Sequence, residues 1–413
     1  MWEDLLVWML RGFIDAGQLQ LTLPSGRVIE LGAGAGPVVA VALLDATLPR
    51  KILFNPEVAI GEAYMDGRLT IANDDLAGFL KLAITSGSSA APWSPVLLLM
   101  KLHKALMRLS DINPVGKSRR NVAHHYDISP ELYALFLDPN KQYTCAYFRD
   151  PGMTLEEAQR AKMQHIGRKL LLKPGMRVLD IGCGFGTLAV MLAKEWGVRV
   201  TGVTLSEVQL AEARQRALAA GVADKVEFRL QDYRLVDGPF DRIVSVGMME
   251  HVGRPHLKTY FQKVRDLLAP DGVALIHYIG HADRPAPISP WYQKYIFPGA
   301  YCPALSEVTP HLEKSGLVLA DMENWRDHYN PTLAGWYTNF MRNIDRIRAL
   351  TDERFCRMWR YYLKSAEITF AHNMLTIHQL QLARRHDAVP NTRDYLYAAP
   401  PAEAAKQRSS AAR

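Results

Sequence analysis

The sequence predicts an α/β protein, with a Rossmann-like parallel sheet and a smaller α+β domain before it. Residues 177–186, RVLDIGCGFG, form a short apolar strand that runs into three glycines, and a helical pattern opens at Thr187. Strand and helix patterns alternate from there to about residue 279, as expected of βαβ units with right-handed crossovers. At 413 residues, 48% of them hydrophobic, the chain is long enough for two domains.

The smaller domain is expected over residues 1–84. Its predicted elements are one helix and two strand-like stretches, in the order 2–15, 19–31 and 38–46. The segment LGAGAGP at 31–37 is similar to a phosphate-binding glycine loop, but an apolar β-type run follows Pro37. No helix N-terminus is therefore offered to an anion, and we predict a bend between strands.

Residues 85–120 are predicted to link the two domains. The part at 85–95 is rich in Ser, Ala, Gly and Pro, as linkers are. A helix is expected over 96–109, and a basic stretch follows at 117–120. At the other end of the chain, residues 386–413 have the composition of a disordered tail.

The larger domain is expected over residues 121–385. Thr154 and Glu157 predict a capping box for a helix over 154–172. The expected strands are 177–182, 198–204, 226–231, 240–246 and 272–279, and the helices between them include 187–196, 206–220 and 256–268. An aromatic and proline-rich stretch at 281–306 has no clear period, which is typical of a lid or binding wall. Two long helices and a strand complete the domain, at 332–350, 352–374 and 376–382.

The composition restricts the classes of partner and site. The net charge is +7, which favours an anionic partner such as a phospholipid surface, although many plain soluble enzymes are as basic. The four cysteines are scattered without a CxxC pair, so neither a disulfide scaffold nor a metal site is predicted. No apolar run reaches the roughly 20 residues of a membrane span, and the N-terminus does not resemble a signal peptide.

The polar residues at the strand ends indicate the class of cofactor. In a dinucleotide dehydrogenase an acidic residue would end the second strand, whereas this strand ends with Thr204. The third strand ends at Asp232 and Tyr233, which suit an adenine amino group and an adenine face. Together with DIGCGFG, this pair resembles the class I methyltransferases that use S-adenosylmethionine (SAM). The expected cofactor-binding residues are Asp180, Gly182, Gly184, Gly186, Thr204, Gln209, Asp232 and Tyr233, with Thr204 and Gln209 as substitutes for the missing ribose acid.

A set of ordered segments makes the resemblance more specific. They are HHYDIS (124–129), YTCAYF (143–148), LDIGCGFG (179–186), TGVTLS (201–206), SVGMMEHVG (245–253), LIHYIG (275–280), KYIFPGAYCPAL (294–305) and DHYNPTL (327–333). In this order they resemble the cyclopropane-fatty-acyl-phospholipid synthase family, which includes the mycolic acid cyclopropane synthases. The resemblance spans about 120–385, and GEAYMDG at 61–67 is similar to the N-terminal domain of longer bacterial members that act on membrane phospholipid.

The resemblance implies an activity and a set of site residues. Members transfer a methylene group from SAM to a cis double bond of an acyl chain, with bound bicarbonate as the base. Its implied ligands here are Glu250, His277, Tyr329 and the backbone at Cys145 and Ile279. The bicarbonate and Glu250 would share a proton, because two adjacent anions repel. The resemblance further implies cofactor contacts from Tyr143 and Thr144, and Tyr126, Tyr143 and Tyr147 as rings that stabilise a carbocation.

Plainer interpretations of these residues stay open. A histidine inside an apolar strand, as His277 is, usually belongs to a satisfied core, and Cys145 would also pack as a small apolar side chain. The glycine turn would also be explained by packing alone. Rival activities are a methyl transfer that leaves a branched chain, a small-molecule N-methyltransferase of the coclaurine type, and an inactive lipid-binding protein.

The predicted partners follow from the same reasoning. They are phospholipids with cis-unsaturated chains and an anionic membrane surface, bound by Lys and Arg of the N-terminal domain and of residues 117–120. No NPPY-type motif accompanies the fold, so a nucleic acid partner is disfavoured. We expect a cytoplasmic protein at the inner face of the membrane, with a homodimer as one assembly to test.

Overall fold

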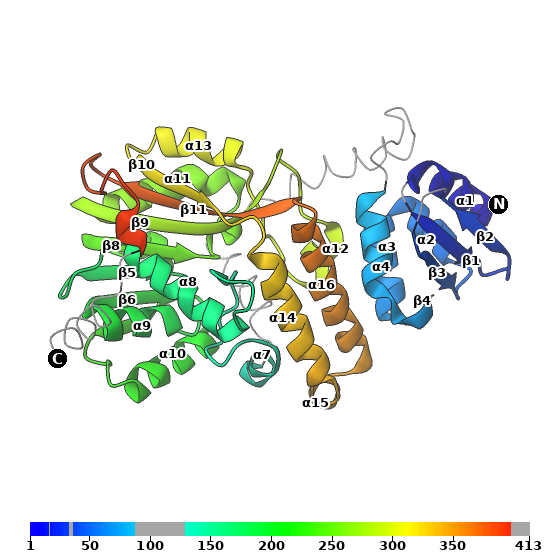
Figure 1. The fold of residues 1–413 in the computed structure, drawn as a ribbon, viewed down its shortest axis with the longest axis horizontal. Coiled ribbons are helices and arrows are strands. Elements are labelled where there is room, and N and C mark those ends of the chain that lie inside the picture. The colour runs from blue at the N-terminus through cyan, green and yellow to red at the C-terminus, as the bar shows by residue number, and fades with distance from the viewer. Residues whose placement is uncertain (16, 33–35, 87–128, 398–413) are drawn as a thin grey trace. The chain divides into compact units, whose positions relative to one another are not determined.

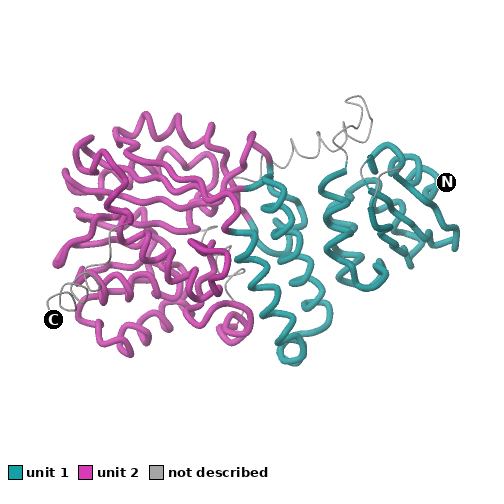
Figure 2. The backbone as a smooth tube through the Cα atoms, in the orientation of Figure 1, with its two compact units in different colours: residues 1–111, 287–298, 329–375 teal, residues 112–286, 299–328, 376–413 magenta. Residues whose placement is uncertain are grey.

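The computed structural model describes residues 1–397 except residue 16 and segments 33–35 and 87–128. The predicted helix at 96–109, the basic stretch at 117–120 and the end of the chain beyond 397 lie outside the described residues. The chain forms two compact units (Figure 2). Unit 1 comprises residues 1–111, 287–298 and 329–375, and unit 2 comprises 112–286, 299–328 and 376–413.

Unit 2 contains a seven-stranded sheet in the order β10-β11-β9-β8-β5-β6-β7. Its strands are β5 (Arg177–Ile181), β6 (Arg199–Thr204), β7 (Val226–Leu230), β8 (Phe240–Val246), β9 (Leu268–His281), β10 (Val318–Asn324) and β11 (Leu375–Ala383). The five strands β7, β6, β5, β8 and β9 pair in parallel, so the predicted α/β fold and its first five strands are confirmed. The sheet is not wholly parallel, because β11 runs antiparallel to β10.

Helices cover both faces of this sheet (Figure 1). They are α7 (Pro130–Phe136), α8 (Leu155–Lys169), α9 (Thr187–Trp196), α10 (Glu207–Ala219), α11 (Leu257–Leu267), α13 (Leu305–Glu313) and α17 (Asp394–Tyr397), with short 3₁₀ helices η3 (Tyr233–Leu235), η4 (Met249–His251) and η5 (Arg254–His256). Alternate residues of one strand enter different cores: Val178 packs with α8, α9 and α10, and Leu179 packs with α11 and α13. The predicted capping box of Thr154 and Glu157 begins α8.

The N-terminal part of unit 1 is an α+β module, as predicted, with a sheet of four strands. Its strands lie in the order β2-β1-β3-β4. The elements are α1 (Trp2–Phe13), β1 (Gln18–Thr22), β2 (Val28–Leu31), β3 (Val38–Leu43), α2 (Leu48–Phe54), α3 (Pro56–Met65), β4 (Leu69–Ile71), η1 (Ala72–Asp74) and α4 (Leu76–Thr85). Strand β3 follows Pro37 directly, so the chain continues there as a strand and not as the helix that a phosphate loop requires.

The compact units divide the chain differently from the predicted domain boundaries. Helices α12 (Pro290–Tyr295), α14 (Tyr329–Arg342), α15 (Ile344–Leu350) and α16 (Glu353–Ala371) belong to unit 1 with the N-terminal module. Helix α12 lies inside the stretch predicted to be irregular, and Asn343 separates the predicted single helix into α14 and α15. Apolar contacts between segments far apart in sequence, such as Ile368 of α16 in the N-terminal core, explain the grouping.

The prediction of disorder from residue 386 is wrong for residues 386–397. Arg393 forms a bidentate ion pair with Asp321 of β10, and the Tyr395 hydroxyl donates to Gln381 of β11 at 2.9 Å. These contacts tie the segment to the sheet despite its polar composition. Within the residues that the structure describes, no helix is both long and apolar enough to span a membrane.

Candidate active site

A cavity lies at the carboxyl ends of β5, β6, β7 and β8 in unit 2. Ligands of open α/β sheets bind at this edge, where loops from several strands converge. The residues predicted from the strand ends come together here: Asp180, Gly182, Gly184, Thr204, Gln209, Asp232 and Tyr233 all line the cavity, as do Tyr143 and Thr144 from the segment before α8. Residues between positions 141 and 252 of the chain thus supply the wall of a single cavity.

The three glycines after β5 have different surroundings. All have positive φ, at 79° for Gly182, 54° for Gly184 and 77° for Gly186. A Cβ at Gly184 would meet no atom within 4 Å, and this residue faces the cavity. Gly186 does not line the cavity, and a Cβ there would lie 2.6 Å from Phe228 and 2.8 Å from Ala213. Gly186 therefore permits close packing of α9 and α10 on the sheet, and its contact with the cofactor stays a prediction.

Asp180 places a buried carboxyl group in the cavity wall. Its Oδ2 atom is buried and makes no hydrogen bond to any described residue. Burial raises the pKa of Asp180 to about 7, because a charge without a partner is costly in a medium of low polarity. A ligand that brings a cation or a hydrogen-bond donor to this oxygen would favour the ionised form.

The second and third strand ends carry polar groups that bond to each other. The Thr204 hydroxyl donates to Gln209 Oε1 at 2.9 Å, so both predicted ribose contacts face the cavity as a pair. Asp232 accepts from the backbone and guanidinium of Arg234 at 2.6–2.9 Å. Burial opposes ionisation of Asp232, but these bonds hold its pKa below the ordinary value. An adenine amino group would share this carboxylate with Arg234.

Lys162, which was not among the predicted site residues, is a buried cation in the cavity wall. Its ammonium donates to the Thr144 hydroxyl at 2.7 Å, and Gln159 one turn earlier donates to the Thr144 carbonyl at 2.8 Å. Burial lowers the pKa of Lys162 to about 8. Gln159, Lys162 and Ile166 share one face of α8, so polar residues at helical spacing beside an apolar residue were the available signal.

Glu250 lies beside the cavity, in η4 after β8. Its Oε1 atom accepts from the backbone N–H of Ile279 at 2.6 Å, whereas Oε2 is buried without a hydrogen-bond partner in the described part of the chain. Burial raises the pKa of Glu250 to about 7. Because Glu250 occupies the Ile279 N–H, that donor would have to be released before it could hold an anion as predicted.

His277 lies two residues before Ile279 on β9. Its Nδ1 accepts from the Gln379 side chain of β11 at 3.0 Å, which leaves the ring proton on Nε2. The ring also meets Trp325 edge to face, with centroids 5.2 Å apart. Burial holds the pKa of His277 well below its ordinary value, so the ring is neutral near pH 7. The hydrogen bond from Gln379 pairs Nδ1, as the interpretation of a satisfied core histidine requires. It does not account for the other ring nitrogen, Nε2.

The remaining predicted residues are distributed over both units. Cys145 is buried, with its thiol toward the Ala146 carbonyl at 3.3 Å, and Tyr147 stacks on His165 with centroids 4.6 Å apart. Tyr329 begins α14 in unit 1, buried 4.5 Å from the Phe370 ring, so its place in the anion site stays a prediction. Tyr126 lies outside the described residues. The structure thus brings together Glu250, His277 and Ile279 beside the cavity, without placing them in its lining.

Comparison with known proteins identifies the family. Residues 115–380 match the family model described as mycolic acid cyclopropane synthetase. The chain is 37% identical to the cyclopropane-fatty-acyl-phospholipid synthase of Escherichia coli strain K12, over 81% of this chain and 85% of that protein. It is 34% identical to a Pseudomonas putida protein named "Probable fatty acid methyltransferase", over 92% of this chain and 96% of that protein.

A solved structure supports the same relationship. The crystal structure of a mycolic acid cyclopropane synthase complexed with SAH and CTAB matches with a TM-score of 0.62 and 31% identity. The match covers 66% of this chain and 99% of that one. The predicted class I methyltransferase fold is therefore confirmed.

Proposed function

The chain belongs to the mycolic acid cyclopropane synthetase family, and from this premise we propose that it transfers a methylene group from SAM to cis double bonds of phospholipid acyl chains. The single observation that carries the proposal is the pair of buried carboxyl oxygens, on Asp180 and Glu250, that accept no hydrogen bond from the described residues. One belongs to the cavity wall and the other lies next to it. Such a pair suits a cationic methyl donor on one side and a proton-accepting site on the other.

The cavity fits SAM by the chemistry of its wall. SAM supplies an electrophilic methyl group on a sulfonium centre. We assign the unpartnered Asp180 oxygen to its ammonium group, Thr204 and Gln209 to the ribose, and Tyr233 to the adenine face. The open space beside Gly184 would let the backbone approach the methionine part closely. SAH, present in the related crystal structure, is what SAM becomes after the methyl group has left.

The base step is assigned to the Glu250 site. Methyl transfer to an alkene leaves a carbocation, and ring closure then needs removal of one proton from the new methyl group. We propose that Glu250 Oε2 and His277 hold a bicarbonate ion as the base. Both residues are buried, and Glu250 Oε2 makes no hydrogen bond to any residue that the structure describes. With a pKa near 7, Glu250 would share a proton with the anion instead of repelling it. Tyr329 and the Cys145 backbone are further proposed ligands.

The second candidate function ends in a branched acyl chain. It is favoured by the name of the Pseudomonas putida relative, a probable fatty acid methyltransferase that is 34% identical over 92% of this chain. The two activities share methyl transfer and differ in the fate of the carbocation. We also propose that the protein works at the cytoplasmic face of the membrane, since its substrate resides in a bilayer and its net charge is +7.

The test is the product of the purified protein with SAM and vesicles of phospholipid that carries cis-monounsaturated chains. Mass spectrometry of the released fatty acids is expected to show a gain of one CH2. Catalytic hydrogenation under mild conditions then separates the outcomes, because a ring takes up no hydrogen and a methylene branch does. A methylene-branched product would support the second candidate. Methylated amines with unchanged fatty acids would contradict both.

A further inference from the structure

Helix α1 exposes an apolar stripe to solvent. Leu5 and Trp8 are 43% and 58% exposed, and Met1 lies one turn before Leu5 on the same face. The opposite face of the helix is already used, because Leu6 and Val7 are buried in the core of the N-terminal module. The exposed stripe therefore contributes nothing to that core.

Helix α2 extends this apolar surface. Phe54, at the end of α2, is 57% exposed, and its ring contacts Trp2 edge to face with centroids 6.1 Å apart. The Arg50 guanidinium lies over the Trp2 ring at 5.6 Å. We call the residues Met1, Trp2, Leu5, Trp8 and Phe54 the α1 patch.

Basic side chains surround the α1 patch without acidic partners. Arg11, Arg50 and Lys51 are exposed and form no ion pair within the described residues. Of the two acids of α1, Asp4 pairs with Arg27 and the N-terminal ammonium, whereas Glu3 accepts hydrogen bonds only from the neutral Ser25 and keeps its charge. Arg11, Arg50 and Lys51 outnumber this one acid, so the net charge at the patch is positive.

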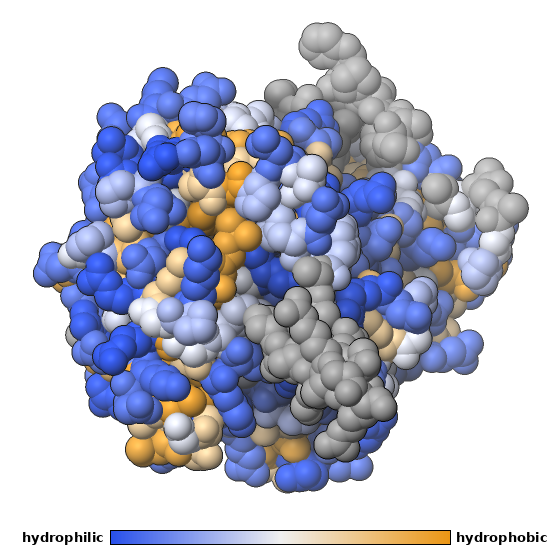
Figure 3. Space-filling model, turned by 60° about the vertical axis from the view of Figure 1, so that its left-hand side comes forward, coloured by the Kyte–Doolittle hydropathy of each residue, from blue (hydrophilic) through white to orange (hydrophobic). Residues whose placement is uncertain are grey.

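Exposure alone would not make this patch a docking site. On the face of the molecule in Figure 3, hydrophobic residues lie in several separate areas among hydrophilic ones, as on most proteins. The α1 patch differs because two tryptophans, a phenylalanine and two aliphatic side chains adjoin and carry a basic rim. Tryptophan prefers the boundary between lipid and water, and a basic rim is complementary to anionic headgroups. A second copy of the same face would instead bring like charges together.

We propose that the α1 patch inserts shallowly into an anionic phospholipid bilayer, with Arg11, Arg50 and Lys51 at the headgroups. This inference deepens the proposed function, because a bilayer is where the proposed substrate lies. Helix α1 would lie in the plane of the interface, with its buried face still on the module core. The patch would thereby hold the whole chain at the surface between successive lipid substrates.

The test is vesicle sedimentation of the full chain without SAM, using saturated lipids so that no turnover occurs. Binding to phosphatidylglycerol vesicles is compared for the wild type, Leu5→Ser/Trp8→Ser, and the control Leu218→Ser. Leu218 is 68% exposed on α10 of unit 2. We expect the double variant to bind at least about tenfold more weakly, and the control to bind as the wild type does. Arg50→Ser/Lys51→Ser should lose about fivefold per charge at low salt.

Two further measurements, sedimentation velocity and lipid turnover, keep the inference distinct from the proposed function. Equal binding of the double variant and the wild type would overturn the patch. The proposal would also be overturned if sedimentation velocity shows a wild-type dimer and a monomeric double variant while vesicle binding is unchanged. The α1 patch would then be a self-association surface. The proposal is supported if the double variant binds vesicles weakly but turns over detergent-dispersed cis-unsaturated phospholipid at the normal rate. If the wild type binds vesicles through the α1 patch but methylates neither vesicle nor detergent-dispersed lipid, the membrane-binding proposal is supported and the proposed function is contradicted.

Discussion

At the scale of single residues, the proposed active site depends on two buried carboxyl groups, each with one oxygen that accepts no hydrogen bond from the described residues. The sequence placed Asp180 and Glu250 at strand ends, and the structure shows both beside one cavity. What the sequence could not indicate is the bonding of each oxygen, because the Ile279 N–H that occupies Glu250 Oε1 comes from another strand. The contact of Arg234 with Asp232 was also not predicted, because it depends on the local turn of η3.

Replacing Glu250 tests the base site. Glu250→Gln keeps the side-chain shape and the bond from Ile279 but cannot share a proton with an anion. We expect turnover to fall at least about a hundredfold, within the usual contribution of a positioned acid–base group, while SAM affinity changes less than about threefold. Single-turnover kinetics and calorimetric titration measure the two. The exposed Glu227→Gln of β7 is the control, and near-normal turnover of Glu250→Gln would contradict the base assignment.

Replacing Asp180 tests the buried charge through stability. The pKa of Asp180 is about 7 in the folded protein and about 3.9 in an unfolded chain. The folded state therefore retains a proton that the unfolded state releases, so this residue contributes stability below pH 4 that is lost as pH rises to about 7. Asp180→Asn removes the effect. Without SAM, the variant should gain up to about 4 kcal/mol relative to the wild type between pH 4 and pH 8.

Denaturant unfolding of both proteins at several pH values checks this expectation. Other titrating groups, such as Glu250 and the buried histidines, are present in both proteins and cancel in the difference. Parallel pH profiles would show that Asp180 is not a buried, unpaired acid. Saturating SAM should flatten the wild-type profile, because an ammonium partner at Asp180 restores the ionised form.

At the scale of elements, the glycine turn separates binding from packing. Gly184→Ala adds a methyl group toward the cavity, where no atom lies within 4 Å, so SAM affinity should fall with a loss of stability of about 1 kcal/mol from the positive φ. Gly186→Ala forces a methyl group against Phe228 and Ala213, which should cost about 2–4 kcal/mol. The folded fraction of Gly186→Ala should bind SAM normally.

Thermal unfolding and SAM titration of the two variants give the comparison. The reverse pattern, with a stable Gly186→Ala that has lost SAM affinity, would support Gly186 as a cofactor contact. The pair also shows what a motif cannot reveal. Gly184 and Gly186 are both glycines of the one motif GCGFG. Only the neighbours of Gly186 in β7 and α10 distinguish its packing role.

The elements that the sequence predicted well are those with a clear period or cap. Strands β5 and β8 are largely apolar, β7 alternates buried and less buried residues, and α8 carries its capping box. Strand β10 was missed because three of the seven residues of VLADMEN are polar and none is fully buried, as is common in an edge strand. The boundary of the predicted tail failed for a related reason, since the order of residues 386–397 comes from an ion pair with that unpredicted strand.

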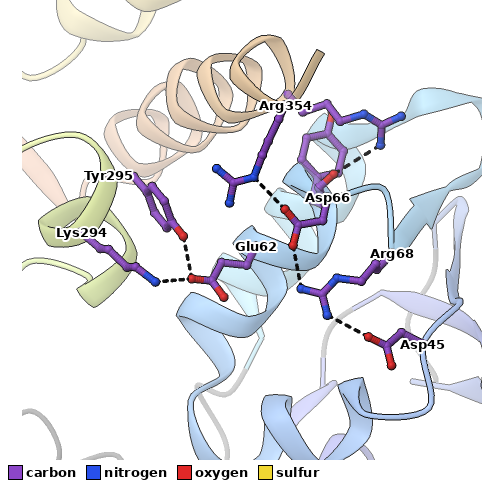
Figure 4. A network of polar contacts seen from close by, with 9 residues as sticks. Asp45, Glu62, Asp66, Arg68, Lys294, Tyr295 and Arg354 are labelled. Carbon is purple, nitrogen blue, oxygen red and sulfur yellow. Dashed lines mark hydrogen bonds and ion pairs between the residues drawn. The ribbon is translucent and has the colours of Figure 1, made fainter. Parts of the chain in front are cut away.

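At the scale of the molecule, the unpredicted feature is the composition of unit 1. The N-terminal module joins α12 and α16 through a polar network (Figure 4). Glu62 of α3 accepts from Lys294 and Tyr295 of α12, each at 2.6 Å, and Asp66 accepts from Arg354 of α16 at 2.8 Å. These partners lie more than two hundred residues apart in the chain, so no local pattern could reveal them.

Apolar contacts hold this unit together more strongly than the network does. Exposed ion pairs contribute at most about 1 kcal/mol each, whereas Trp291 of α12 is fully buried against α3 and Tyr361 of α16. Gly61 of α3 makes the contact possible, since a Cβ there would lie 2.4 Å from the Trp291 indole. The predicted wall at 281–306 is thus partly a fixed element of unit 1.

Gly61→Ala tests whether the module and α12 form one cooperative body. The added methyl group has to displace the Trp291 indole, so we expect a loss of about 1–3 kcal/mol and faster amide exchange in both α3 and α12. Gly12→Ala is the matched control, because Gly12 also lies in a helix but a Cβ there meets no atom within 4 Å. It should gain about 0.5–1 kcal/mol. Unchanged exchange in α12 would mean that the two segments unfold independently, whereas coupled loss would show that the N-terminal module supports a segment more than two hundred residues away.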